Sequence, residues 1–425
     1  MLCYLKLSNY SSKGACIMIQ WYADRMSELV LRKGVNLKKG QCLNIKVGYK
    51  SVEYASVMAA KAYEFGAKYV HIDVDDPRVL ASRSLYQKKS EDLEYVPLFV
   101  QAMETEFAAE EWAFVRIDSG EERVNKTESN LNSLQKITKA MRMARKVSSK
   151  KLMANEISWC VTVCPGPLWA KQILGDDANE EDLAKLLSQT LRIDTEDYLK
   201  RWDIFDKEAT RRCEYLNSLN IEKLHYTSPV TDFTVGLKPF ARFCGGAADL
   251  PDKSRFFANL PTEEIFTTPD KDSASGFIKT TRVVSVMNHD TEGVTLHFEK
   301  GKVTHFTAEK GKEIMEKYLE TDEGASRLGE VALVDAYSPI SSTGVNFGSI
   351  LIDENASCHI ALGDGYPECL MTEKPMLTDK DKAKNGCNNS LVHTDFMVGS
   401  KDLDIVAITR DGKEIKIMDK GRFKF

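Results

Sequence analysis

Five side chains that can bind a divalent cation occur in the second half of this 425-residue chain, and they must converge in the fold if they act together. The sharpest pair is His393 and Asp395, in the segment LVHTDFMVG. In an extended segment residues i and i+2 point to the same face, so this imidazole and this carboxylate converge while Thr394 turns away. The other three are Glu264 in NLPTEEIFTTP, Glu330 in RLGEVALVD and His359 in CHIALGDGY. Three carboxylates and two imidazoles exceed the ligand set of one structural zinc ion and would serve a hydrolytic centre of two metal ions.

The surroundings of these residues support the prediction. Glu330 follows Gly329 and begins an apolar run, His359 lies four residues before Gly363, and His393–Asp395 runs into Phe-Met-Val-Gly. Ligand residues favour such element ends, where a rigid scaffold presents a side chain to a cleft. Taken singly, a glutamate is more often a helix cap or a surface ion-pair residue, and a histidine before an apolar run is more often buried and hydrogen-bonded. It is the joint occurrence that favours a metal site.

The four blocks NLPTEEIFTTP, RLGEVALVD, HIALGDGY and NSLVHTDFMVGS resemble, in order and spacing, the thermophilic metalloaminopeptidase family of the aminopeptidase T or leucyl aminopeptidase type. The resemblance extends from about Trp21 to the C-terminus, and Met1 to about Ile17 has no counterpart. It implies a hydrolase that removes N-terminal residues from peptides with two divalent metal ions, and it implies a homodimer. The implied ligands are Glu264, Glu330, His359, His393 and Asp395, with Tyr366 beside them. Because the family's ligand directly precedes Ile-Phe, the resemblance selects Glu264 over its neighbour Glu263.

The ligand types indicate a mechanism but leave parts of it open. The candidate ions are Zn²⁺, Co²⁺, Mn²⁺ and Mg²⁺, among which the affinity order alone does not choose. Two such ions would polarise the scissile carbonyl and acidify the attacking water, and one could take the free α-amine of the substrate. The bridging ligand is left open, and Glu330 is a candidate general base as well as a ligand. Tyr366 is either a donor to the tetrahedral oxyanion or a packed aromatic in its loop.

Composition excludes several other classes. The formal net charge of −5 argues against a nucleic-acid-binding surface, which is normally strongly basic. No apolar run reaches the ~18 residues that span a bilayer, and residues 1–18 lack the apolar core of a signal peptide. We expect this extension to be disordered. Ten cysteines at irregular spacings, without a CxxC pair, indicate reduced thiols and a cytoplasmic protein.

Residues 19–220 alternate helical and extended patterns, which predicts an α/β scaffold domain with a mainly parallel, doubly wound sheet. Helical patterns run over Trp21–Lys33, Ser51–Phe65, Glu128–Val147, Glu180–Leu191 and Thr195–Leu216. Extended patterns run over Cys42–Val47, Tyr69–Val74, Trp112–Ile117 and Ser158–Val163. No GxGxxG or GxxxxGK[ST] follows these strands, so the sequence does not support a nucleotide-binding function for this half.

Residues 221–425 predict a β-rich α+β catalytic domain that contains every proposed ligand. The extended patterns are Phe233–Leu237, Arg282–Val286, Val294–Phe298, Val303–Phe306, Val331–Val334, Ser349–Ile352, Ile405–Thr409 and Glu414–Met418. Hairpins are expected through Glu299–Lys302 and through Asp411-Gly412, and Gly311–Leu319 predicts a helix.

Two functions of other classes compete with a metal-dependent aminopeptidase. A two-metal centre also hydrolyses phosphate esters, although only Arg327 and Lys401 supply cations near the four blocks. The second alternative is a non-catalytic interaction protein stabilised by a closed tetrahedral site, against which five oxygen-rich ligands argue. The pair Cys160 and Cys164 is more typical of buried apolar residues than of zinc ligands. No GxSxG elbow occurs, which removes the common serine-hydrolase alternative.

Overall fold

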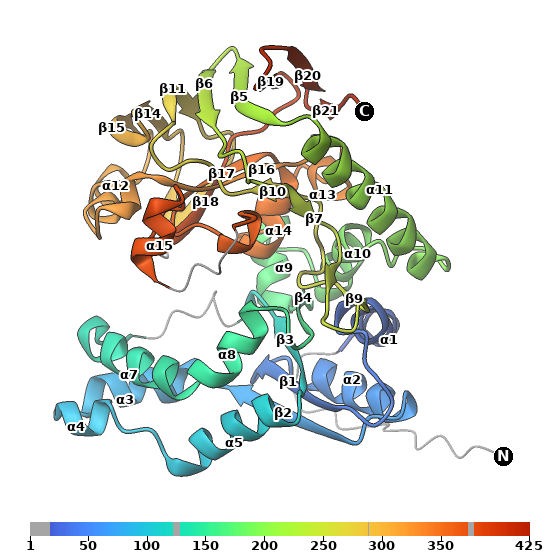
Figure 1. Ribbon diagram of the computed structural model, residues 1–425. Coiled ribbons are helices and arrows are strands. Elements are labelled where there is room, and N and C mark those ends of the chain that lie inside the picture. Colours follow the sequence, from blue (N-terminus) through green and yellow to red (C-terminus); the bar gives the residue numbers. More distant parts are fainter. Residues whose placement is uncertain (1–17, 122–127, 288, 373–377) are drawn as a thin grey trace. The chain divides into compact units, whose positions relative to one another are not determined.

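The computed structural model describes residues 18–121, 128–287, 289–372 and 378–425, and its contacts divide the chain into two compact units (Figure 1). Among these described residues, the first unit contains those up to Glu28 together with those within Leu37–Lys150 and Val163–Leu187. The second contains Leu29–Asn36, Lys151–Thr162 and Ser188–Phe425. The predicted N-terminal extension, apart from Met18, lies outside the described residues.

A four-stranded sheet of order β2-β1-β3-β4 forms the centre of the N-terminal region. Its strands are β1 Cys42–Gly48, β2 Tyr69–Asp75, β3 Ala113–Asp118 and β4 Trp159–Val163. Strand β1 pairs in parallel with both β2 and β3, and its residues Leu43, Ile45 and Val47 are buried. A central parallel strand is covered on both faces, which explains why this segment is a nearly continuous apolar run.

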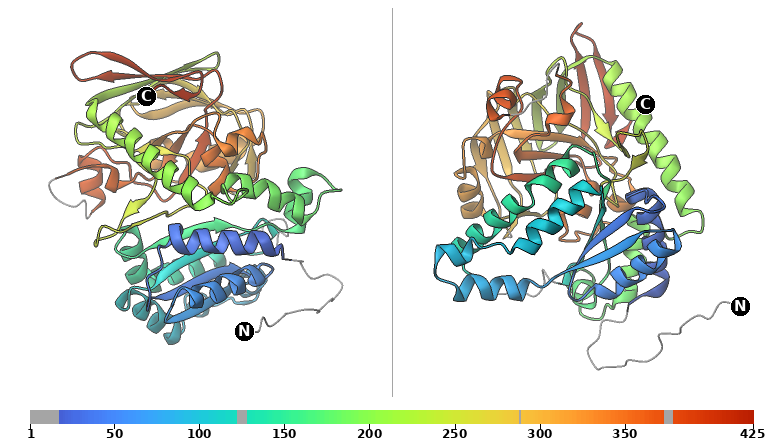
Figure 2. Two further views of the ribbon diagram at one scale, coloured as in Figure 1. Left: turned by 90° about the vertical axis from the view of Figure 1, so that its right-hand side faces the viewer. Right: turned by 60° about the horizontal axis from the view of Figure 1, so that its bottom comes forward.

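Helices flank this sheet in the sequence and in space (Figure 2). Helix α2 packs against β1 and β2, whereas α3, α4 and α5 contact α7. The helices are α1 Gln20–Leu29, α2 Val52–Glu64, α3 Pro77–Tyr86, α4 Ser90–Leu93, α5 Leu98–Ala109, α7 Leu131–Ala144, α8 Lys146–Met153, α9 Pro167–Leu174 and α10 Glu180–Thr190. A π-helical turn, η1 Val30–Gly34, continues α1.

The second unit is built mainly from antiparallel strands (Figure 1). One sheet has the order β18-β17-β16-β10-β7, and a larger one has the order β15-β14-β11-β6-β5-β19-β20-β21. Its strands are β5 Ile221–Ser228, β6 Thr231–Gly236, β7 Cys244–Gly245, β8 Ala248–Asp249, β9 Arg255–Phe256, β10 Ile265–Thr267, β11 Ser275–Lys279, β12 Val284–Val286, β13 His289–Thr291, β14 Thr295–Glu299, β15 Lys302–Thr307, β16 Leu328–Leu333, β17 His359–Gly363, β18 His393–Met397, β19 Asp404–Thr409, β20 Glu414–Asp419 and β21 Arg422–Phe423. Its helices are α11 Tyr198–Ser218, α12 Lys312–Leu319, α13 Pro339–Ser342, α14 Ile350–Asp353 and α15 Asp379–Lys384, with the 3-10 turns η2 Gly324–Ser326, η3 Glu354–Ala356 and η4 Pro367–Cys369.

The predicted fold class is confirmed, with a parallel sheet and helices first and antiparallel sheets after them. Both predicted hairpins form, as β14–β15 and β19–β20. None of the helices in the described residues has the length and apolarity that crossing a membrane requires.

Two element predictions are wrong. The pattern Ser349–Ile352 is not extended, because the chain forms helix α14 there. The Asp353 carboxylate accepts hydrogen bonds from the backbone N–H groups of Phe347 (2.8 Å) and Ser349 (3.0 Å), which folds this short apolar run into a turn. The single helix predicted over Glu128–Val147 is two helices that break at Arg145, whose side chain pairs with Glu104 (3.1 Å).

Candidate metal centre

The five predicted ligands come together on the five-stranded sheet of the second unit. Its strands β16 and β17 are buried along their whole length. A polar side chain on such strands is costly unless it finds partners. The predicted ligands are Glu264 immediately before β10, Glu330 on β16, His359 at the start of β17, and His393 and Asp395 on β18.

Strand register explains why these side chains share one face of the sheet. Glu330 pairs with Ala361, and Ala361 pairs with Asp395, so the three residues form one row across the strands. His359 lies two residues before Ala361 and His393 two residues before Asp395, which places both imidazoles on the same face. Because Ala361 carries only a methyl group, the carboxylates on either side of it can approach each other.

Glu330 lies between two groups of possible ligands. Its Oε1 is 4.0 Å from His359 Nε2, which is 3.3 Å from Glu264 Oε2. Its Oε2 is 3.4 Å from His393 Nε2, which is 3.3 Å from Asp395 Oδ1. Each group of three can hold a cation, and Glu330 belongs to both.

Backbone carbonyls orient the two imidazoles. His393 Nδ1 lies 2.7 Å from the carbonyl oxygen of Asp364, and His359 Nδ1 lies 3.2 Å from that of Ser357. In each ring Nδ1–H donates to the carbonyl, which leaves Nε2 facing the carboxylates. This is the arrangement by which proteins fix the tautomer of a metal-binding histidine.

Two glycines let the strands meet closely at this point. A β-bulge separates Leu328 from Glu330, and a Cβ at Gly329 would come within 2.0 Å of the carbonyl oxygen of Asp364. Gly363 ends β17 with φ +113°, in the region that favours glycine. The backbone geometry therefore requires glycine at both Gly329 and Gly363.

Glu263, the residue before Glu264, is held by contacts outside the two ligand groups. The carboxylate of Glu263 pairs with both terminal nitrogens of Arg192, and one of these contacts, from Nη2 to Oε2, is 2.9 Å. The backbone N–H of Glu263 donates to Asn355 Oδ1 at 2.7 Å. Asn355 Nδ2 in turn donates to Glu354 Oε1 at 3.3 Å. These contacts fix the chain where it delivers Glu264 to the centre.

The charged groups of the centre strongly affect one another. Burial raises the pKa of Glu330 to about 7, and the nearby carboxylates act in the same direction. Burial alone would lower the pKa of both imidazoles, but pairing with the carboxylates raises it to about 10 for His359 and about 12 for His393. Although burial opposes it, the hydrogen bond with His393 keeps the pKa of Asp395 below its usual range. Without cations, protons therefore balance part of the negative charge.

Tyr366 lies next to this group. Its hydroxyl oxygen is 3.4 Å from His393 Nε2, and its ring packs edge-on against Phe266 with centroids 5.5 Å apart. The backbone N–H of Tyr366 donates to Thr268 Oγ1, and that hydroxyl donates to the Tyr366 carbonyl, both at 2.9 Å. Burial and the nearby carboxylates raise the pKa of the phenol, so it remains a hydrogen-bond donor.

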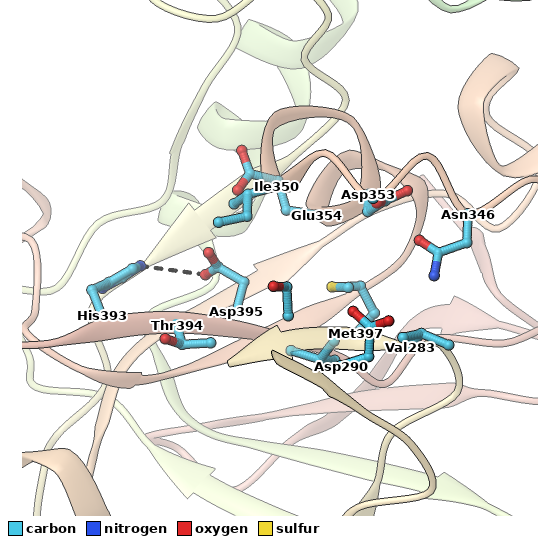
Figure 3. A pocket seen from close by; sticks show the side chains of 13 residues that line it. Val283, Asp290, Asn346, Ile350, Asp353, Glu354, His393, Thr394, Asp395 and Met397 are labelled. Carbon is cyan, nitrogen blue, oxygen red and sulfur yellow. Dashed lines mark ion pairs between the residues drawn. The ribbon is translucent and has the colours of Figure 1, made fainter. Parts of the chain in front are cut away.

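Sequence reasoning missed Glu354. A pocket that is open to solvent borders β18, and its acidic lining comprises Asp290, Asp353, Glu354 and Asp395 (Figure 3). Burial and the charges of Asp395 and Glu264 raise the pKa of Glu354 well above its usual range. The only sequence signal is its place five residues before His359, which by itself does not distinguish it from other glutamates.

The donor set fits divalent cations. Three carboxylates and two imidazoles form the two groups, and the charges of their members act on Glu354 beside them. Ligands of this kind become deprotonated when a metal ion binds, and the ion then supplies the positive charge. The two groups that share Glu330 provide mixed oxygen and nitrogen donors.

Comparisons with known proteins show which family this chain resembles along its length. The model of the family "Thermophilic metalloprotease (M29)" matches residues 20–423. The chain is 35% identical to aminopeptidase 2 of Geobacillus stearothermophilus, over 95% of this chain and 97% of that protein. It is 32% identical to aminopeptidase T of Thermus thermophilus, over 94% and 98% of the two chains. The solved structure of wild-type AmpT from Thermus thermophilus superposes with a TM-score of 0.84 at 29% identity, covering 96% of this chain and 100% of that one.

The first prediction is that metal binding releases protons. At pH 7 both imidazoles and part of Glu330 carry protons in the cation-free centre, so filling it should release about two to three protons. Protons compete with the ion, so the apparent affinity for Zn²⁺ should rise as the pH is raised from 6 to 8. Calorimetric titration with Zn²⁺ in two buffers of different ionisation enthalpy measures the release. Heats that do not depend on the buffer would contradict the arrangement.

The second prediction concerns Ala361, which is fully buried between two ligand strands. Ala361→Leu should weaken Zn²⁺ binding roughly 10- to 100-fold, equivalent to about 1–3 kcal/mol of overpacking, although no ligand is removed. Ala407→Leu is the matched control, because Ala407 is equally buried but lies on β19 in the other sheet. Equal Zn²⁺ affinity of the two folded variants would show that Ala361 does not shape the centre.

Proposed function

This chain belongs to the thermophilic metalloprotease (M29) family and is a metalloaminopeptidase, and from that premise we propose that it removes N-terminal residues from peptides at a centre of two divalent metal ions. The observation that carries the proposal is the position of Glu330 between two groups of ligand atoms. Its aminopeptidase relatives favour peptide hydrolysis over the phosphoesterase and the non-catalytic alternatives.

In the proposed arrangement Glu264 and His359 would hold one ion and His393 and Asp395 the other, and Glu330, which has one oxygen toward each group, would contribute to both. When bound, two such ions polarise the scissile carbonyl and lower the pKa of the attacking water. Zn²⁺, Co²⁺, Mn²⁺ and Mg²⁺ remain the candidate ions. Because both oxygens of Glu330 face ligand groups, we assign it as a ligand rather than as the general base.

Two further residues would move or donate protons. Glu354 lies outside both ligand groups, borders the pocket and has a raised pKa, as expected of a group that carries a proton from the attacking water to the leaving amine. The Tyr366 hydroxyl, protonated and 3.4 Å from His393 Nε2, would donate a hydrogen bond to the tetrahedral oxyanion. Both assignments follow from position and protonation together.

The acidic lining of the pocket also bears on the substrate. Asp290, Glu354 and Asp395 favour a positively charged group, such as the free α-amine of a peptide.

We propose that residues 221–425 form the catalytic domain and residues 19–220 a scaffold domain. The homodimer and the cytoplasmic location remain predictions.

The third prediction compares the adjacent glutamates. Glu264→Gln should lower kcat by at least about 100-fold, because it removes a negatively charged ligand from the centre. Glu263→Gln should keep Zn²⁺ binding and kcat within a few-fold of wild type but cost about 3 kcal/mol of stability, since it leaves the Arg192 charge without its buried partner. Kinetics, Zn²⁺ titration and urea unfolding of both variants test this. If Glu263→Gln lost metal while Glu264→Gln kept it, the two roles would be reversed.

The fourth prediction is a requirement for a free α-amine. Leu-Gly-Gly should be cleaved, and N-acetyl-Leu-Gly-Gly should be cleaved at least about 100-fold more slowly, because the blocked amine no longer places the first carbonyl at the centre. Mass spectrometry of the products measures both reactions, beside p-nitrophenyl phosphate as a phosphoester. Comparable cleavage of the two peptides, or cleavage at internal bonds, would overturn the exopeptidase function and leave the metal site standing.

A further inference from the structure

Two cysteine thiols face each other close to the metal centre. Cys244 lies on β7, and Cys369 is the last residue of η4. Their Sγ atoms are 3.9 Å apart. Cys369 is fully buried, whereas Cys244 is partly exposed. One of the two thiols can therefore meet a reagent from solution, and the other lies behind it.

The backbone holds these two segments side by side. The N–H of Arg242 donates to the carbonyl oxygen of Cys369, and the N–H of Met371 donates to that of Phe240, both at 2.8 Å. Ala241 and Leu370 form an antiparallel bridge between these contacts. A disulfide needs an S–S distance of about 2.05 Å; in this register Arg242, two residues before Cys244, lies opposite Cys369, so the two sulfurs approach each other diagonally across the segments. Rotation of the side chains and an adjustment of the backbone must close the remaining distance between the two sulfurs.

We propose that Cys244 and Cys369 are a redox modification site, at which a low-molecular-weight disulfide such as oxidised glutathione converts the two thiols into an intramolecular disulfide. This inference goes beyond the aminopeptidase function and does not depend on the assignment of the metal ligands. In the first step the Cys244 thiolate attacks one sulfur of the reagent and forms a mixed disulfide, while the other half leaves as a thiolate. Cys369 then loses its proton and attacks the Cys244 sulfur of the mixed disulfide. The second half of the reagent leaves as a thiolate. Two electrons pass from the protein thiols to the reagent.

The environment assigns different roles to the two sulfurs. The Cys369 thiol donates a hydrogen bond to Cys244 Sγ, and with the nearby charge of Arg242 this lowers the pKa of Cys244 although burial opposes it. The same hydrogen bond and burial raise the pKa of Cys369. A more exposed thiol of lowered pKa is the expected attacking group, and the buried thiol is the resolving one.

The modification would act on the catalytic residues through the backbone. The N–H of Cys369 donates to the carbonyl oxygen of Tyr366 at 3.1 Å. On the other side, Cys244 pairs with Phe266, which lies two residues after Glu264. Drawing the sulfurs together pulls on both segments, and misplacement by about 1 Å can cost roughly 100-fold in rate. We expect the disulfide to lower kcat at least about tenfold, with unchanged metal content.

The test is a peptide map of the metal-loaded wild-type enzyme after incubation with oxidised glutathione and alkylation of the remaining thiols. The expected product is a cross-linked pair of peptides that contain Cys244 and Cys369, with loss of kcat that dithiothreitol restores. Cys244→Ser and Cys369→Ser should keep their activity under the same treatment. Cys213→Ser is the matched control. Cys213 is a thiol on α11 whose pKa is raised by burial and by the nearby Cys244, and this variant should respond like wild type.

Several outcomes would overturn the proposal. Glutathione that stays on Cys244, a cross-link to Cys213, or no reaction would each exclude the pair as a disulfide site. A complete Cys244–Cys369 cross-link that leaves kcat unchanged would exclude its effect on catalysis. If Cys369→Ser does not fold, the wild-type map decides the question by itself. The map reads a covalent bond, so failure of the proposed mechanism at the metal centre would leave it intact.

Discussion

Charge balance on one face of a buried sheet is the constraint on which the rest of the second unit depends. Glu330 and His359 are 3% and 1% exposed, on strands that are otherwise apolar. Ionised groups in such a place are stable only when opposite charges and hydrogen bonds surround them. The carboxylates and imidazoles satisfy one another partly, and protons make up the difference. Divalent cations can replace those protons, which is why the stability of the fold and the loading of the centre are linked.

A second group of contacts keeps the ligands in position without touching a cation. Arg192, which follows α10, holds Glu263, and Asn355 of η3 links the backbone at Glu263 to the side chain of Glu354. These residues are far apart in sequence, yet they meet where Glu264 enters the sheet. A ligand on a loop would be less well fixed than one at the start of a strand supported from both sides.

The sequence was informative where local geometry determines the result. His393 and Asp395 share a face because the period of a strand is two, and the hairpins follow from their turn residues. Glu354 could not be recognised in the same way, because its importance arises from tertiary contacts with Asp395 and Glu264. The contact between Cys244 and Cys369 joins residues 125 positions apart, so no spacing rule predicts it. The extended pattern predicted for Ser349–Ile352 was wrong because three consecutive apolar residues show no period, and the hydrogen bonds of Asp353 decide the conformation of this segment.

The short strand β10 connects these features. Glu264 immediately precedes it, and Thr268 immediately follows it and holds Tyr366 through two reciprocal hydrogen bonds. On the side away from β16, strand β10 pairs with β7, which carries Cys244. A shift of this strand would therefore move Glu264 and Tyr366 together, the proposed metal ligand and oxyanion donor, whereas the proposed ligands on β18 lie at the far edge of the sheet. Because the two sets of residues depend on different strands, movement of β10 would displace Glu264 and Tyr366 while leaving the group formed by Glu330, His393 and Asp395 in place.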